Sequence, residues 1–277
     1  MKPTRQRPNG LATVGTERLV VITFSANLGF LWTELSLPNA IHAAHRAGFA
    51  AVECHWPYDV PACDVSAALR ETGLPMLGLN TRRGDVGAGD MGLSAVPGRE
   101  AEARAAIDEA VTYATAIGAK AVHVMAGNAQ GRRARATFAE NLHYACVAGG
   151  DDMTMLIEPL NAHDAPDYFL RDTEQAQQII EDVGLPNVRL MFDCYHVGRT
   201  EGDVLRRMVE LRDIIGHIQF ASVPDRAEPD HGDVDYQMVF ACAKELGFDR
   251  PLGAEYRPTG ATSDTLQWMI DLTGGAA

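Results

Sequence analysis

Hydrophobic positions along the chain fall into short, nearly continuous runs that alternate with longer amphipathic stretches. Such runs are typical of parallel strands buried on both faces, and they occupy residues 19–27, 50–56, 75–81, 120–127, 153–161, 188–196, 215–222 and 251–258. Helical periodicity covers residues 38–47, 62–72, 99–117, 132–148, 172–183, 203–212, 235–246 and 263–272. Repeated strand-helix alternation predicts an α/β fold, a (β/α)8 TIM barrel.

Several of the predicted helices stop at a glycine just before the next strand. These are Gly48, Gly73, Gly118, Gly184 and Gly247. A glycine adopts the left-handed conformation of a helix C-cap at little cost. The glycines therefore support the predicted boundaries.

The chain has 277 residues, of which 46% are hydrophobic, and a single barrel typically uses roughly 250 residues. Residues 1–17 are polar, rich in Pro, Gly and Thr, and lack a hydrophobic period. We expect them to form a flexible N-terminal tail. Residues 18–277 are expected to form one TIM-barrel domain.

The balance of charge narrows the class of function. A formal net charge of -13 disfavours binding to nucleic-acid phosphates or to an anionic membrane surface. The five cysteines are scattered and odd in number, which indicates a reducing compartment. No apolar stretch approaches the roughly 20 residues of a membrane span. A cytoplasmic enzyme acting on small molecules is the expectation.

Four of the predicted strands end in a polar side chain that can bind a metal ion. The segments are MLIEPLN at 155–161, LMFDCYH at 190–196, GHIQFAS at 216–222 and GAEYRP at 253–258, and they supply Glu158, Asp193, Gln219 and Glu255. Their spacing is about one strand-plus-helix unit. Because the carboxyl ends of barrel strands meet at one mouth, we expect the four side chains to converge there.

Carboxylates that point inward without a counter-charge are costly to bury. We therefore expect a cation to bind between Glu158, Asp193, Gln219 and Glu255. Three carboxylates and one amide form an all-oxygen donor set, which favours Mg²⁺ or Mn²⁺ over zinc. The competing interpretation is that Glu158 and Glu255 are buried acids paired with Arg257 or Arg189, or that they cap helices.

Two further residues are candidates for substrate binding. His196 lies just beyond a strand end and is placed to hydrogen-bond a substrate oxygen, although a supporting structural role is the alternative. Arg226 lies in the loop that follows Gln219, where a guanidinium suits a carboxylate, and a solvated loop arginine is the alternative.

Other polar residues near the strand ends have less defined roles. We expect His217 to support Gln219 by packing, and Glu53 to bridge to a ligand or to His55, with no catalytic role assigned. Arg82 and Arg83 open one of the two long loops, 82–98 and 223–234. Long loops on the active face of a barrel usually shape the site.

Several motifs together resemble the hydroxypyruvate isomerase family of the xylose-isomerase-like barrels. They are VECHWPYD at 52–59, GDVGAGDMGLSAVPGREAEAR at 84–104, VHVMAGN at 122–128, ATFAENL at 136–142, LIEPLN at 156–161, FDCYH at 192–196 and GHIQFASVPDRAEPDHGDVDY at 216–236. The likeness covers nearly everything after residue 19. CHWPYD, NTRRGD and the loop around Arg226 depart from the usual family pattern, which bears on the substrate more than on the reaction type.

The resemblance implies a divalent-metal-dependent isomerisation of the aldose-ketose type, of hydroxypyruvate to tartronate semialdehyde. The family also includes isomerases of 2-oxo-tetronates. It implies that Glu158, Asp193, Gln219 and Glu255 bind the metal and that Glu158 and Glu255 are the catalytic acids. Related ketose 3-epimerases have a histidine at the position of Gln219, which argues against an epimerase.

Such a reaction is expected to move a carbonyl along a carbon chain through an enediolate, either with one glutamate as base and the other as acid or with a single carboxylate that shuttles the proton along one face. The alternatives are a ketose 3-epimerase, a dehydratase of a cyclic polyol ketone, an apurinic-site endonuclease and a non-catalytic sugar-acid binding protein. The net charge of -13 and the oxygen-rich donor set disfavour the nuclease. A homo-oligomer is compatible with a barrel's apolar helix faces.

Overall fold

The protein is described by a computed structural model that places residues 21–272. Its parallel strands are β1 Phe24–Asn27, β2 Ala51–Glu53, β3 Gly78–Asn80, β4 Ala121–His123, β5 Thr154–Ile157, β6 Val188–Asp193, β7 Ile215–Phe220 and β8 Leu252–Ala254. They form an 8-stranded sheet in the order β2-β1-β8-β7-β6-β5-β4-β3. The tail predicted for residues 1–17, and the start of the strand predicted for residues 19–27, lie outside the described residues.

The two ends of this sheet meet between β2 and β3. Val52 forms a parallel bridge with Met76, the backbone N–H of Leu77 donates to the carbonyl of Val52 at 2.8 Å, and that of Cys54 donates to Gly78 at 3.2 Å. These bonds close the ring of strands. The predicted (β/α)8 TIM barrel is therefore confirmed.

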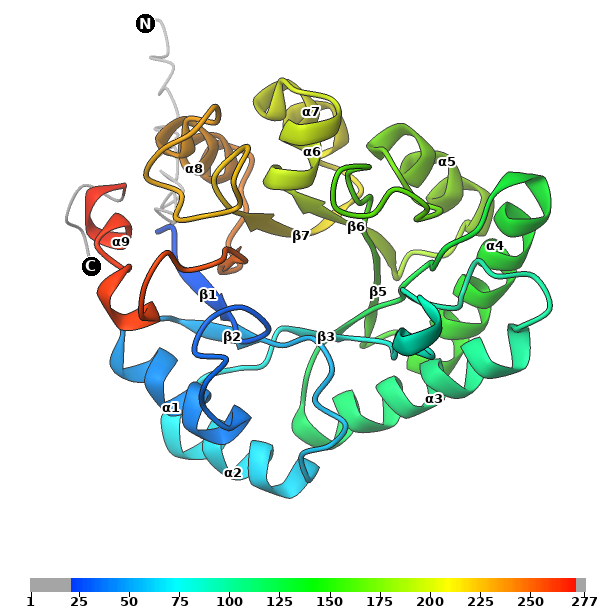
Figure 1. The fold of residues 1–277 in the computed structure, drawn as a ribbon, viewed down its shortest axis with the longest axis horizontal. Helices are drawn as coiled ribbons and strands as arrows, with labels where there is room; N and C mark the ends of the chain where they lie inside the picture. The colour runs from blue at the N-terminus through cyan, green and yellow to red at the C-terminus, as the bar shows by residue number, and fades with distance from the viewer. Residues whose placement is uncertain (1–20, 273–277) are drawn as a thin grey trace, which may run out of the picture.

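Helices surround the strands on the outside of the barrel (Figure 1). They are α1 Leu37–Arg46, α2 Ala62–Thr72, α3 Glu100–Ile117, α4 Gly131–Gly149, α5 Thr173–Val183, α6 Cys194–Thr200, α7 Val204–Leu211, α8 Tyr236–Glu245 and α9 Trp268–Asp271, with 3-10 turns η1 Val86–Ala88 and η2 Thr262–Asp264. Within residues 21–272, no helix has the length and apolar character needed to cross a membrane.

The glycines used to place helix ends have the expected backbone. Gly48, Gly73, Gly118, Gly184 and Gly247 all have positive φ, between 66° and 87°. Gly73, for example, ends α2 in the left-handed conformation and donates its N–H to the carbonyl of Leu69. The boundaries that rested on these glycines are confirmed.

The observed strands are all shorter than the predicted ones, and two predicted elements also differ in type. The strand predicted for 188–196 ends at Asp193, because its Oδ1 accepts a hydrogen bond from the N–H of Tyr195 at 2.8 Å and thereby caps helix α6. His196 is therefore helical. The helix predicted for 263–272 is divided into η2 and α9.

The end of the chain is packed onto the barrel by aromatic side chains. The ring of Trp268 in α9 lies 5.0 Å from Phe24 of β1 and 5.4 Å from Phe220 of β7, in edge-on geometry. Such contacts stabilise a core beyond the area that they bury. They fix the strands on either side of β8, which is followed directly by Glu255, the last of the predicted ligands.

Candidate active site

Four polar side chains lie where the last four strands of the barrel end. Glu158 follows β5, Asp193 ends β6, Gln219 is the penultimate residue of β7, and Glu255 follows β8. Register places Asp193 opposite Gln219, and Gln219 opposite Gly253. All four residues are buried, with exposed fractions of 6%, 1%, 2% and 5% in chain order. The structure thus brings the four predicted ligands to one end of the barrel.

Three of these side chains leave an oxygen without a hydrogen-bond partner among the described residues. The atoms are Oε1 of Glu158, Oδ2 of Asp193 and Oε1 of Gln219. A buried polar atom without a partner costs about 1 to 3 kcal/mol. Carboxylate and amide oxygens are ligands of hard divalent cations. The donor set therefore fits a bound cation of that kind.

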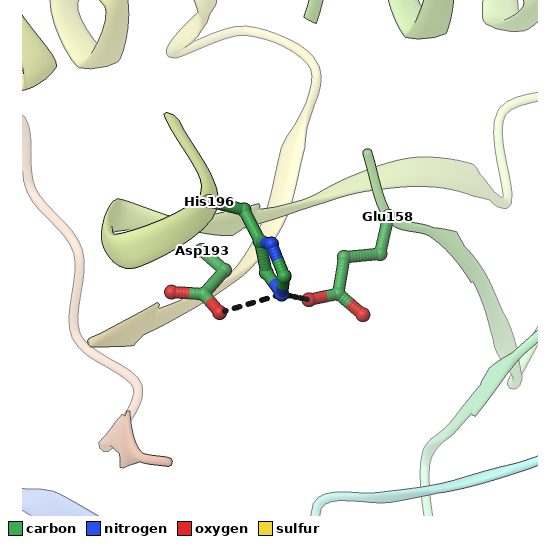
Figure 2. Close-up of side chains that lie close together, drawn as sticks. All are labelled: Glu158, Asp193 and His196. Carbon is green, nitrogen blue, oxygen red and sulfur yellow. Dashed lines mark ion pairs between the residues drawn. The ribbon is translucent and has the colours of Figure 1, made fainter. Parts of the chain in front are cut away.

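His196 lies between two of these carboxyl groups, as Figure 2 shows. Its Nε2 is 3.8 Å from Oε1 of Glu158 and 3.7 Å from Oδ2 of Asp193. One ligand atom from each of the three residues lies within 4.8 Å of the others. Glu158, Asp193 and His196 thus form a buried group that could bind a metal ion.

The hydrogen bonds of the His196 ring fix where its proton is. The backbone N–H of Asn161 donates to Nδ1 at 3.0 Å. A backbone N–H can only donate, so Nδ1 is an acceptor and a neutral ring has its proton on Nε2. Burial and the charge of Arg226 lower the pKa of His196 to about 3. His196 is therefore a neutral donor whose N–H faces the carboxyl groups.

Glu255 differs from the other acids because both of its oxygens are hydrogen-bonded. Nδ2 of Asn27 donates to Oε1 at 2.8 Å, and Nε2 of His55 lies 2.9 Å from the same oxygen. Nη2 of Arg226 donates to Oε2 at 2.7 Å. These bonds stabilise the ionised form of Glu255 and fix its orientation.

The two predicted catalytic acids consequently have opposite pKa shifts. Burial, together with the charges of Glu255 and Asp193, raises the pKa of Glu158 well above its ordinary value. Burial alone would also raise the pKa of Glu255, but the hydrogen bond with His55 and the charge of Arg226 lower it. Without a metal ion, Glu158 therefore holds its proton to a higher pH than Glu255 does.

Arg226 is a buried residue of the site, not a solvated loop arginine. Only 8% of it is exposed, and its guanidinium lies 4.8 Å from the ring centres of both Phe30 and Tyr195. Nη2 bonds Glu255, Nη1 lies 3.5 Å from Asp164, and Nε is buried without a partner in the described part of the chain. The arginine therefore holds one free donor at the site.

The alternative pairing of the acids with Arg189 or Arg257 is wrong. Arg189 donates to the backbone carbonyls of Pro186 and Asp213, and the guanidinium of Arg257 lies 5.9 Å from the ring of Phe30. The arginine that pairs with Glu255 is Arg226.

The remaining arginine candidates lie in the loop after β3. Arg82 forms an exposed ion pair with Glu109 at 2.7 Å, and Arg83 stacks on Trp56 at 3.9 Å. Neither contact involves the predicted ligands. Arg82 and Arg83 are thus not assigned to the catalytic group.

Three polar neighbours of the acids were not predicted as such: Asn27, His55 and His123. His55, which was expected as a possible partner of Glu53, pairs with Glu255. Glu53 instead bonds His217 and the predicted ligand Gln219.

Asn27 ends β1 and His123 ends β4, and Nδ1 of His123 lies 3.6 Å from Oε2 of Glu158. Asn27 ends the predicted strand 19–27 and therefore had the same signal as the four ligands, whereas His123 lies inside the predicted strand 120–127 and did not.

The chain is similar to proteins of known sequence and structure over most of its length. A family model described as the xylose isomerase-like TIM barrel matches residues 41–272. Identity with the 2-oxo-tetronate isomerase of Cupriavidus necator is 43% over 258 residues, 91% of this chain and 98% of the relative. Identity with the hydroxypyruvate isomerase of Escherichia coli is 35% over 254 residues, 90% of this chain and 98% of the relative.

A solved structure supports the same placement. A crystal structure from Brucella melitensis, described as an AP endonuclease of family 2, is 34% identical and superimposes with a TM-score of 0.87, covering 91% of this chain and 99% of that one. The class is that of the xylose isomerase-like TIM barrels. Within this class the chain belongs to the hydroxypyruvate isomerase family of enzymes, which includes 2-oxo-tetronate isomerases, and the resemblance seen in the sequence motifs is confirmed.

Proposed function

We propose that the protein is a metal-dependent isomerase that interconverts hydroxypyruvate and tartronate semialdehyde, with a 2-oxo-tetronate as the alternative substrate. The observation that carries this proposal is the unequal environment of two buried glutamates at one end of the barrel. Glu255 is held ionised by three donors, whereas Glu158 keeps an unpartnered oxygen within the described residues. An acid and a base with separated pKa values suit a proton transfer between adjacent carbons.

In this proposal Glu158, Asp193, Gln219 and Glu255 bind Mg²⁺ or Mn²⁺. The three unpartnered buried oxygens support it, because an oxygen-rich set favours these ions. When bound, the ion supplies positive charge that stabilises the developing enediolate oxygen.

Proton transfer is assigned to the two glutamates. Glu255 takes a proton from the carbon that bears the hydroxyl group, and Glu158 gives one to the neighbouring carbonyl carbon. The hydroxyl proton moves to the former carbonyl oxygen as the aldehyde forms, and the two glutamates regain their starting protonation states by exchange with water. The hydrogen bonds that hold Glu255 ionised support its role as base. Glu158 is assigned as the acid because burial and the neighbouring carboxyl groups raise its pKa in the metal-free protein, and a bound ion would lower the pKa of both glutamates. In the reverse direction the roles exchange.

Arg226 and His196 are assigned to the substrate. The free Nε–H of Arg226 suits the carboxylate of a keto acid. The N–H at Nε2 of His196 suits a substrate oxygen. A protonated ring nitrogen cannot bind a cation, so Gln219 is a better metal ligand than His196.

Other activities of the same barrel fit the site less well. A ketose 3-epimerase is disfavoured by the amide of Gln219, and a polyol dehydratase would need a substrate without the acid group that Arg226 suits. An apurinic-site endonuclease, the activity given for the Brucella structure, must approach DNA phosphates, which a net charge of -13 opposes.

The proposal is tested by assaying metal-stripped protein with hydroxypyruvate and with a 2-oxo-tetronate, before and after addition of Mg²⁺ or Mn²⁺. Proton NMR follows loss of the substrate and appearance of the isomer. Metal-dependent conversion of at least one acid is the expected result, and the faster substrate defines the specificity. Conversion of neither acid by metal-loaded protein would contradict the proposed function.

A further inference from the structure

We propose that Glu53 is a positioning residue that turns the amide of Gln219 so that its oxygen faces the metal site. This inference rests on the metal site of the proposed function. Gln219 is the one amide in the predicted ligand set, and an amide has an oxygen and an NH2 group of similar size. Only the oxygen can bind a cation, so its orientation decides whether Gln219 is a ligand.

Packing by itself leaves the amide of Gln219 room to turn. A cavity of about 500 Å³ occupies the barrel interior below the site, and Gln219 lines it together with Glu53, His123 and Asn27. On the side of this cavity no close packing holds the amide. A hydrogen bond at that side therefore contributes to its orientation.

Glu53 provides that hydrogen bond. It ends β2, is 4% exposed, and its Oε1 accepts from Nε2 of Gln219 at 3.4 Å. Between these two groups only the NH2 of the amide can donate to the carboxyl oxygen. Oε1 of Gln219 therefore points away from Glu53. It is one of the buried oxygens without a partner in residues 21–272.

Glu53 is itself held in place. Its Oε2 lies 2.6 Å from Nε2 of His217, which is also on β7. Gly253 of β8 leaves room for this group, because an added Cβ would lie 2.3 Å from Oε1 of Glu53, 2.8 Å from Cγ of Gln219 and 3.0 Å from Nε2 of His217. Residues from β2, β7 and β8 thus fix the amide before a cation binds.

The test measures Mn²⁺ affinity by electron paramagnetic resonance, which does not depend on turnover. Glu53→Leu removes the acceptor and the charge, whereas Glu53→Gln removes the charge and keeps a carbonyl acceptor. We expect the leucine variant to weaken Mn²⁺ binding about 10- to 100-fold and the glutamine variant to weaken it much less. If the two variants weaken Mn²⁺ binding equally, Glu53 acts only through its negative charge and the proposal is wrong. The proposal is also wrong if both variants bind Mn²⁺ like the wild type, or if the wild type does not bind Mn²⁺.

A variant with a carboxylate at position 219 separates the effect of Glu53→Leu on the orientation of the Gln219 amide from any other effect of that substitution. A carboxylate presents an oxygen whichever way it turns, so in protein with Gln219→Glu the further change Glu53→Leu should not weaken Mn²⁺ binding. Weakening equal to that in the wild-type background would contradict the proposal. If Glu53→Leu fails to fold by circular dichroism, His217→Leu removes the partner that holds Oε2 of Glu53 and leaves the charge of Glu53 intact. This variant is expected to weaken Mn²⁺ binding, and unchanged affinity would contradict the proposal.

The two proposals can fail separately. If Mn²⁺ binding responds to Glu53 as expected but neither keto acid is converted, the positioning role stands and the proposed substrate is wrong. If the keto acids are converted but both Glu53 variants bind Mn²⁺ like the wild type, the isomerase stands and the positioning role is wrong.

Discussion

Arg226 donates from Nη2 to Oε2 of Glu255 at 2.7 Å, which joins the loop after β7 to the end of β8. The same nitrogen lies 3.8 Å from Oδ2 of Asp193. One guanidinium thus neutralises part of the charge of two predicted metal ligands. Its Nε has no hydrogen-bond partner within residues 21–272, and the proposed contact with the substrate carboxylate would use this N–H.

Replacing Arg226 with alanine is expected to raise the KM for the acid substrate about tenfold or more, because a hydrogen bond to a charged group contributes about 1.5 to 3 kcal/mol. Steady-state kinetics check this. Arg257→Ala is the matched control, since Arg257 lies near the same Phe30 ring at 5.9 Å, and its KM should stay near that of the wild type. An unchanged KM in the Arg226 variant would remove this residue from substrate binding.

Gly29→Ala tests the hydrogen bond between His55 and Glu255 without changing either residue. An added Cβ would lie 2.1 Å from Nδ1 of His55, so the ring must move. We expect kcat to fall about tenfold, the effect of losing one hydrogen bond to a charged group. Gly260→Ala is the control, because the nearest atom to its Cβ is 4.0 Å away.

The same loss should follow from His55→Leu. Combining Gly29→Ala with His55→Leu should then add no further loss, because the ring that the alanine displaces is already absent. Additive losses would show that Gly29→Ala acts through something other than His55.

The raised pKa of Glu158 makes a prediction about stability. The folded, metal-free protein keeps a proton that the unfolded chain releases near the ordinary pKa of 4.5. Its stability should therefore fall as the pH rises from that value toward the raised pKa. Thermal unfolding in a chelator measures this fall, at about 2 to 4 °C for each kcal/mol in a chain of this size.

The glutamine in Glu158→Gln cannot ionise, so the stability of this variant should fall less as the pH rises. Adding Mg²⁺ to the wild-type protein should likewise reduce the fall in stability. A wild-type protein whose stability follows pH as the glutamine variant does would show that Glu158 has no raised pKa.

Much of the fold and of the ligand set followed from the hydrophobic pattern. Buried parallel strands give continuous apolar runs, and the end of each run placed Glu158, Asp193, Gln219 and Glu255 at one mouth. Strand lengths were less accurate, since hydrophobicity continues past the last ladder hydrogen bond. The predicted strand 188–196 included His196 because the cap that Asp193 forms is a side-chain bond that periodicity does not reveal.

The partners of the acids were harder to predict because they come from strands far away in the sequence. Asn27 and Glu255 are separated by 228 positions, and His55 and Glu255 by 200. Barrel closure places β1 beside β8, but which side chain reaches which carboxyl group depends on register and on local space such as that at Gly29. The opposite pKa shifts of the two glutamates follow from those contacts.

The most direct test of the assigned proton transfer is proton NMR of hydroxypyruvate in D2O with metal-loaded Glu158→Gln and Glu255→Gln variants, after their metal content has been measured. With Glu255 as base, the Glu158 variant should exchange the hydrogens on the hydroxyl-bearing carbon for deuterium without forming the aldehyde isomer. The Glu255 variant should do neither. Exchange by the Glu255 variant but not by the Glu158 variant, or near-normal turnover in the Glu255 variant, would contradict the account.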